Sequence, residues 1–129
     1  DVVDRNLEGA PRYFISYRKG QPFISDEVPE TYRNPMVFHE LTEFEKLVGQ
    51  ENRCVNALKA ELTTIPESQK SDYIGFRTEV FRELVNYLES NNEDPSFITE
   101  VRKSVSYLEE LKWKKQILTT NQTQILQMM

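Results

Sequence analysis

Apolar side chains recur at helical spacing along most of the chain after residue 34. Before Pro66 they alternate at spacings of four and three, and eight of the nine positions are apolar: Val37, Leu41, Phe44, Val48, Glu51, Val55, Leu58, Leu62 and Ile65. Asn34 is a favoured N-cap, and Pro35 suits the first helical position. The pattern predicts one long helix over residues 35–64 with a heptad seam, and Gly49 marks a bend or a close helix crossing within it.

Two more helices are predicted downstream. Residues 71–90 begin at the candidate cap Ser71 and carry apolar side chains around much of the helix, which predicts that this helix is the most buried. Asp94 followed by Pro95 marks the start of a helix over residues 95–128. Its seam consists of Phe97, Val101, Ser104, Leu108, Leu111, Lys115, Leu118, Gln122, Ile125 and Met129. The polar residues Ser104, Lys115 and Gln122 interrupt this seam, which weakens after Leu111.

Residues 1–33 lack helical periodicity. Residues 12–26 contain two stretches of strand formers around Lys19-Gly20, which can form a tight turn. Pro22 has no amide hydrogen and should restrict the second strand to a sheet edge. We therefore consider two alternatives of equal weight: a small β-hairpin over residues 12–26, or an extended aromatic arm that packs across the helices.

Together these elements predict a mainly α fold, in which the three helices form a bundle with partial coiled-coil character behind the arm. The chain has 129 residues, of which 38% are hydrophobic and 29% charged, as expected for one globular domain. We expect most of the seams to pack within the chain rather than in an intermolecular coiled coil. The last turns of the third helix outrun the second helix and need another cover.

The composition bears on where in the cell the protein is expected. No apolar run is long enough for a membrane span, and the N-terminus does not resemble a signal peptide. Cys54 is the only cysteine, which favours an intracellular protein, cytoplasmic or nuclear. Because the sequence starts at Asp1 rather than at methionine, we expect a fragment of a longer chain.

Charge is unevenly distributed along the chain. The net charge is −5, yet no acidic residue follows Glu110, whereas Lys112, Lys114 and Lys115 lie just beyond it. A nucleic-acid-binding domain would normally present a broad basic face. An acidic chain with one short basic segment is a poor fit to that class.

Residues that could carry catalysis are sparse. His39 is the only histidine, and Cys54 lies 15 residues later on the same predicted helix, so we interpret both as structural. The acids near them are interpreted as a solvated face: Glu40, Glu43, Glu45 and Glu51. No glycine-rich phosphate loop is present. We predict no catalytic residue, metal, cofactor or small-molecule substrate, and an enzyme that uses the acidic face with a divalent ion is the least favoured class.

Trp113 is the strongest candidate for a functional side chain. At about 100° per residue it points about 200° away from Leu111, and lysines flank it. We favour burial of this ring between two helices; the alternative is an exposed aromatic anchor for an acidic protein surface. The candidate partner-binding residues are Leu111, Lys112, Trp113, Lys115, Ile117, Leu118 and Ile125.

The leading functional hypothesis is therefore a non-enzymatic module for protein–protein interaction or assembly, through self-association or a protein partner. The alternative is a nucleic-acid accessory domain, because aromatic and basic residues interleave in the arm and could stack on single strands. Its candidate residues are Arg12, Tyr13, Tyr17, Arg18 and Lys19. The nearby acids Asp26, Glu27 and Glu30 count against this alternative.

Overall fold

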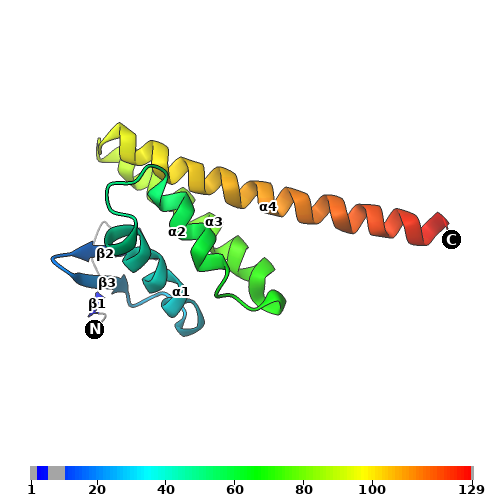
Figure 1. Cartoon of the computed structure of the whole chain (residues 1–129), viewed down its shortest axis with the longest axis horizontal. Coiled ribbons are helices and arrows are strands. Elements are labelled where there is room, and N and C mark those ends of the chain that lie inside the picture. Colours follow the sequence, from blue (N-terminus) through cyan, green and yellow to red (C-terminus); the bar gives the residue numbers. More distant parts are fainter. Residues whose placement is uncertain (1–2, 6–10, 129) are drawn as a thin grey trace.

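The computed structural model describes the backbone of residues 3–5 and 11–128 and the side chains of residues 11–114. The chain is mainly helical with a small sheet before the helices, which confirms the predicted fold class (Figure 1). The predicted hairpin is present, because β2 (Ile15–Arg18) pairs antiparallel with β3 (Gln21–Ser25). Lys19 and Gly20 join the two strands with φ values of 52° and 78°, and two successive positive φ angles characterise a type I′ turn.

The position of β3 in the sheet differs from the prediction based on Pro22. A short strand, β1 (Val3–Arg5), pairs parallel with β3, so the strand order is β1-β3-β2 and β3 is central. The pairing with β1 covers only Phe23 to Ser25, and Pro22 lies just before it. A proline is tolerated in this central strand because the missing amide hydrogen falls outside the ladder with β1.

The single first helix predicted over residues 35–64 is wrong in detail. The structure has α1 (Glu30–Leu41), a π-helical segment η1 (Thr42–Lys46) and then α2 (Arg53–Leu62). The predicted start at Asn34 and Pro35 is also wrong, because α1 begins after Pro29 and both residues lie inside it. Gly49 and Asn52 adopt left-handed conformations, with φ values of 81° and 59°, and such residues interrupt a right-handed helix. The heptad pattern continues through these residues and therefore does not predict the break.

The other two helices agree well with the sequence. α4 (Pro95–Met128) has the predicted bounds, and α3 (Glu67–Ser90) has the predicted end. The predicted start of α3 at Ser71 is wrong, because the helix begins directly after Pro66 and Ser71 lies inside it. The Asp94 cap is confirmed, because the Ser96 amide donates a hydrogen bond to Asp94 Oδ1 over 2.9 Å. α4 packs against α3 and α2, and α1 packs against α2 and the strands β2 and β3.

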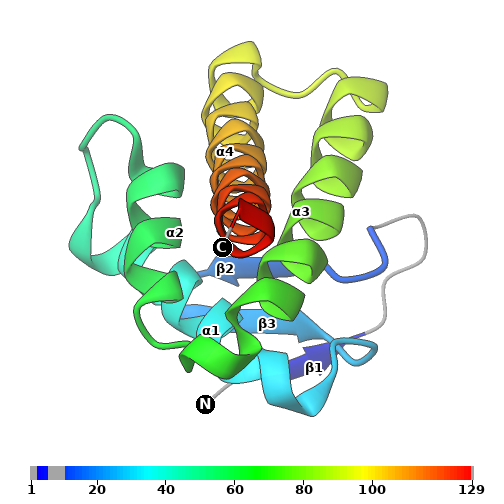
Figure 2. The ribbon, with the colours of Figure 1, turned by 90° about the vertical axis from the view of Figure 1, so that its right-hand side faces the viewer.

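The core has two parts. The larger lies among α2, α3 and α4 and includes Leu58, Tyr73, Phe81, Val101 and Leu108. The smaller joins β3, α1 and α3 through Ile24, Val28, Met36 and Val80. In Figure 2, which looks along α4, α2 and α3 flank that helix and the sheet with α1 lies below them. α3 is therefore buried on two sides, in line with its broad apolar circumference.

Two glycines allow a matched test of the break after η1. A Cβ added at Gly49 or Gly75 meets no atom within 4 Å, so packing does not distinguish the two sites. Gly49 has a φ of 81°, whereas Gly75 lies inside α3. We expect Gly49→Ala to lower the free energy of unfolding by about 1 kcal/mol, and Gly75→Ala to raise it by about 0.5–1 kcal/mol. Urea denaturation checks both; equal effects would contradict the break.

Candidate functional site

Trp113 is exposed, so the favoured interpretation of burial between two helices is wrong. Its exposed fraction is 62%, and Lys112 and Lys114 beside it are exposed too. Leu111 is half-buried and packs on the edge of the larger core. The surroundings of Trp113 are those expected from the alternative interpretation, in which an exposed ring lies between lysines. The candidates Lys115, Ile117, Leu118 and Ile125 fall outside the residues whose side chains are described.

The C-terminal part of α4 extends beyond the remaining helices. Leu108 is fully buried, and the helix continues past Leu111 to Met128, which adds about 25 Å at a rise of about 1.5 Å per residue. Figure 1 shows this end of α4 projecting away from the rest of the chain, with no other element alongside it. This α4 extension, residues 111–128, is the largest feature that the fold leaves without a neighbour among the described elements.

The basic and aromatic arm is occupied by contacts within the chain. Tyr13 packs on Phe76 with ring centroids 5.1 Å apart, and the Tyr17 hydroxyl donates a hydrogen bond to Glu45 over 2.7 Å. Arg12 forms an ion pair with Glu27 at 3.2 Å. Arg18 and Lys19, at the end of β2 and in the turn after it, are exposed. These rings pack against the helices instead of forming a stacking platform.

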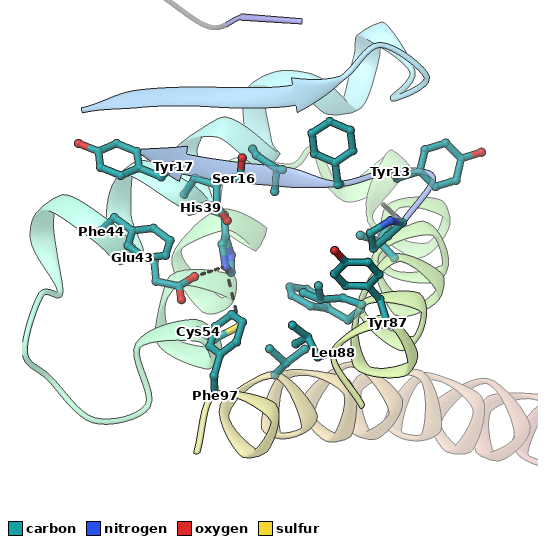
Figure 3. Close-up of a pocket in the computed structure, with 18 of the residues that line it drawn as sticks. Tyr13, Ser16, Tyr17, His39, Glu43, Phe44, Cys54, Tyr87, Leu88 and Phe97 are labelled. Atoms are coloured by element: carbon teal, nitrogen blue, oxygen red, sulfur yellow. Dashed lines mark hydrogen bonds and ion pairs between the residues drawn. The ribbon is translucent and has the colours of Figure 1, made fainter. Parts of the chain in front are cut away.

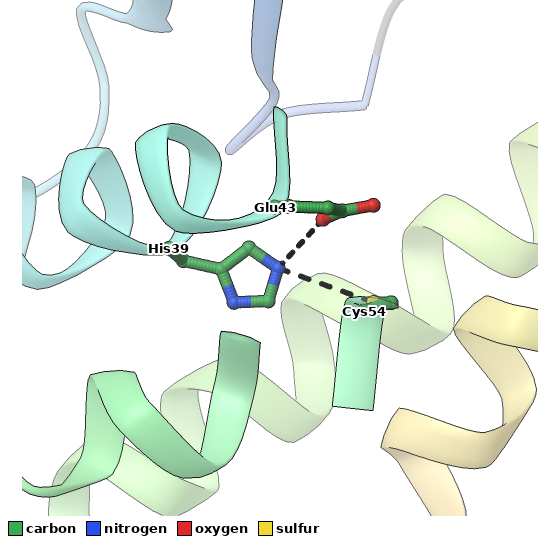
Figure 4. Close-up of side chains that lie close together, drawn as sticks. All are labelled: His39, Glu43 and Cys54. Atoms are coloured by element: carbon green, nitrogen blue, oxygen red, sulfur yellow. Dashed lines mark hydrogen bonds and ion pairs between the residues drawn. The ribbon is translucent and has the colours of Figure 1, made fainter. Parts of the chain in front are cut away.

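A cluster of buried polar side chains lies where α1, η1 and α2 meet (Figure 4). His39 is near the end of α1, Glu43 is in η1 and Cys54 is in the first turn of α2, and all three are at most 4% exposed. The His39 Nε2 atom lies 3.0 Å from Glu43 Oε2 and 4.0 Å from Cys54 Sγ. Their ligand-capable atoms all fall within 4.8 Å of one another.

A second ring of polar groups surrounds the cluster. Glu61 Oε1 lies 2.8 Å from the other imidazole nitrogen, Nδ1, as a close ion-pair contact whose angle departs from that of a hydrogen bond. Glu61 in turn accepts hydrogen bonds from Arg77 at 2.8 and 3.1 Å and from the Tyr73 hydroxyl. On the other side, the Ser104 hydroxyl of α4 donates to Cys54 Sγ over 3.0 Å.

Electrostatics couple these groups strongly. Burial alone lowers the pKa of His39, but its contacts with Cys54, Glu43 and Glu61 outweigh burial and raise the pKa well above the ordinary 6.5. Burial raises the pKa of Glu61, but the charge of Arg77 and the contact with His39 lower it by more than burial raises it, so the net shift is downward. Glu61 is therefore held as a carboxylate in a fully buried position.

The pKa of Glu40 is shifted upward, in the opposite direction to that of Glu61. It is 7% exposed, and burial raises its pKa from 4.5 to about 8, with the charge of Glu43 adding to the increase and those of His39 and Arg77 opposing it. Near neutral pH this carboxyl is largely protonated. The interpretation of Glu40 and Glu43 as part of a solvated acidic face is thus wrong, because both side chains are buried.

A cavity of about 390 Å³ reaches the cluster. It lies between β2, α1, α3 and the start of α4, and Figure 3 shows His39, Glu43 and Cys54 on one wall. Aromatic side chains line much of the remainder, including Tyr13, Tyr87 and Phe97. A polar cluster at the wall of a largely apolar cavity is the usual setting of a small-ligand or ion site.

The cluster has two possible chemistries. The order thiol, imidazole and carboxylate resembles that of a cysteine nucleophile with its base and orienting acid. However, Cys54 is only 3% exposed, its sulfur is held by Ser104, and Glu43 already contacts the nitrogen that would act as base. Sulfur, nitrogen and oxygen donors that converge on one point are instead typical of a transition-metal site.

The sequence contains part of this signal. His39 and Glu43 are four residues apart, a spacing that places two side chains on one helical face and brings an imidazole close to a carboxylate. A single continuous helix would place Cys54 too far along the axis from His39 for a shared site. The break after η1 instead brings α2 back against α1, and no periodicity in the sequence predicts that approach.

Comparisons with known proteins assign no relationship. No protein-family model matches the chain, and no curated protein or solved structure is significantly similar to it. Among the helices that the structure describes, none combines the length and apolar character required to cross a bilayer.

Proposed function

We propose that the chain is a non-enzymatic protein–protein interaction module that assembles through the α4 extension. The observation that carries this proposal is Trp113, which is 62% exposed at the point where α4 leaves the bundle. Tryptophan is enriched among the residues that contribute most of the binding energy at protein interfaces. An isolated helical segment gains little stability from its own backbone, so packing against a partner would stabilise the extension.

Charge favours an acidic partner surface, and we propose a second copy of this chain as that partner. Residues 111–129 contain three lysines and no acid, a net charge of +3. Because the whole chain carries −5, residues 1–110 carry −8. The cationic extension of one copy is thus complementary to the acidic bundle of another. The free thiol of Cys54 fits an intracellular setting for this assembly.

Sedimentation equilibrium of the full chain tests the proposal. We expect a dimeric mass at high protein concentration, and weaker association at high salt because the complementary charges are screened. Trp113→Ala should weaken dimerisation by about tenfold or more, as expected for an interface anchor. A chain truncated after Glu110 should sediment as a monomer.

Val48 provides a matched control, because it is also 62% exposed but lies in the loop after η1. Val48→Ala should leave the dimerisation constant unchanged. A full chain that stays monomeric at high concentration would refute self-assembly, as would equal effects of Trp113→Ala and Val48→Ala.

A further inference from the structure

The geometry of the buried cluster points to a metal site, and we infer that His39, Glu43 and Cys54 bind a zinc ion. This inference is independent of assembly through α4. Imidazole nitrogen, carboxylate oxygen and thiolate sulfur are the three protein donors that zinc uses. They come from three consecutive segments, α1, η1 and α2, so a bound ion would tie the break in the first helix together.

The distances between the donors fit a tetrahedral ion. Zinc bonds of about 2.3 Å to sulfur and about 2.0–2.2 Å to nitrogen and oxygen imply separations of roughly 3.4–3.6 Å between neighbouring donors. The His39 Nε2 to Glu43 Oε2 distance is 3.0 Å, and the Nε2 to Cys54 Sγ distance is 4.0 Å. The donor atoms of Cys54 and Glu43 lie within 4.8 Å of each other, so the sulfur must move toward the other two donors to complete the coordination shell.

The surrounding groups have the arrangement that metal ligands require. A ligating histidine normally places its second nitrogen against a carboxylate, which orients the ring and increases its basicity. Glu61 occupies this place 2.8 Å from His39 Nδ1, and Arg77 and Tyr73 hold Glu61 in position. A thiolate also needs a donor, and the Ser104 hydroxyl lies 3.0 Å from the Cys54 sulfur.

Charge also balances when the ion is present. The two positive charges of zinc and that of Arg77 equal the sum of three negative charges, from the Cys54 thiolate, Glu43 and Glu61. His39 is then neutral, as a metal ligand must be. Because three protein ligands fill three corners of the tetrahedron, the fourth position is left for a water from the adjoining cavity, which His39, Glu43 and Cys54 line.

Cobalt provides the probe for this site, because Co²⁺ accepts the same donors and zinc binds them more tightly. The metal-free full chain should develop a near-ultraviolet thiolate-to-cobalt charge-transfer band that saturates at one ion per chain. Zinc should abolish the band by displacing cobalt. Cys54 is the only cysteine and His39 the only histidine, so such a band reports this site alone.

Two pairs of variants separate metal ligation from general structural effects. Glu43→Gln removes a ligand and should weaken zinc binding by at least about tenfold, whereas Glu51→Gln changes an exposed acid and should not. Ser104→Ala removes the hydrogen bond to the sulfur and should weaken binding by about 10–100-fold, whereas Ser106→Ala on the exposed face of α4 should not. Circular dichroism verifies that each variant folds.

The absence of a thiolate band when the folded wild-type chain is given excess cobalt would overturn the inference. Binding of equal strength by Glu43→Gln and wild type would overturn it as well. Rapid alkylation of Cys54 by iodoacetamide that zinc does not slow would also contradict the site and would favour the nucleophile chemistry instead. Protection of the thiol by stoichiometric zinc supports it.

Discussion

Replacing Arg77 with methionine is expected to lower the free energy of unfolding by about 3–5 kcal/mol, which is the typical loss when one partner of a buried ion pair is removed. The Arg77 and Glu61 side chains are 1% and 0% exposed, and they share two hydrogen bonds. Without the guanidinium, the Glu61 carboxylate remains buried with less positive charge nearby. Methionine keeps much of the side-chain volume, so this loss reports electrostatics more than a cavity.

A control for this variant lies on the same helix. Arg82 pairs with Glu109 at 2.6 Å, but these side chains are 53% and 48% exposed. We expect Arg82→Met to cost less than about 1 kcal/mol, because solvent screens such pairs. Adding Glu61→Gln to Arg77→Met should recover part of the loss, since no unpaired charge remains. Urea denaturation measures all these variants, and equal losses for Arg77→Met and Arg82→Met would disprove the buried pair.

Stability of the metal-free chain is expected to fall as pH rises from 5 to 8. Below pH 4.5 the Glu40 carboxyl is protonated in both the folded and the unfolded chain; between 4.5 and about 8 only the folded chain retains the proton. The free energy of unfolding then decreases by about 1.4 kcal/mol per pH unit for this group. His39, whose pKa is raised above 6.5, adds a loss of the same sign above that pH.

Glu40→Gln isolates the contribution of this carboxyl, since glutamine resembles the protonated acid at every pH. Over three pH units the wild type loses about 3–4 kcal/mol through Glu40. The variant should therefore match the wild type near pH 5 and exceed its stability by about 3 kcal/mol at pH 8. Urea denaturation at each pH, with a chelator present, measures the difference. Glu51→Gln serves as the exposed control, and a parallel pH profile for wild type and Glu40→Gln would contradict the prediction.

Local signals in the sequence predicted much of the fold. The α4 start follows from Asp94-Pro95, because a side-chain cap and a fixed φ act within one turn. The hairpin follows from Lys19-Gly20 for the same reason. Such features depend on neighbouring residues only, so a single sequence contains the information that specifies them.

The break in the first helix has a different origin. Its heptad spacing continues through Val48 and Glu51, yet both side chains are exposed, so the periodicity there does not correspond to burial. The chain turns because Gly49 and Asn52 accept left-handed conformations and tertiary packing favours the return of α2 against α1. That energy depends on contacts between distant segments, which the spacing of apolar residues does not encode.

In the candidate sites too, features set by neighbouring residues could be predicted from the sequence, and features set by contacts between distant segments could not. Trp113 could be singled out from sequence because its angular position and flanking lysines are local properties, although its exposure had to come from the structure. The buried cluster combines residues from α1, η1, α2, α3 and α4, including Glu61 and Arg77, which nothing in the sequence marked. Only the His39–Glu43 spacing was visible in advance.

The position of Trp113 also determines what optical spectroscopy can observe in this protein. It is the only tryptophan, and in the folded chain its indole already contacts water. Its emission is consequently a poor indicator of whether the core is intact. The same ring becomes a specific probe of anything that covers α4, because removal of water from an indole shifts its emission to shorter wavelength.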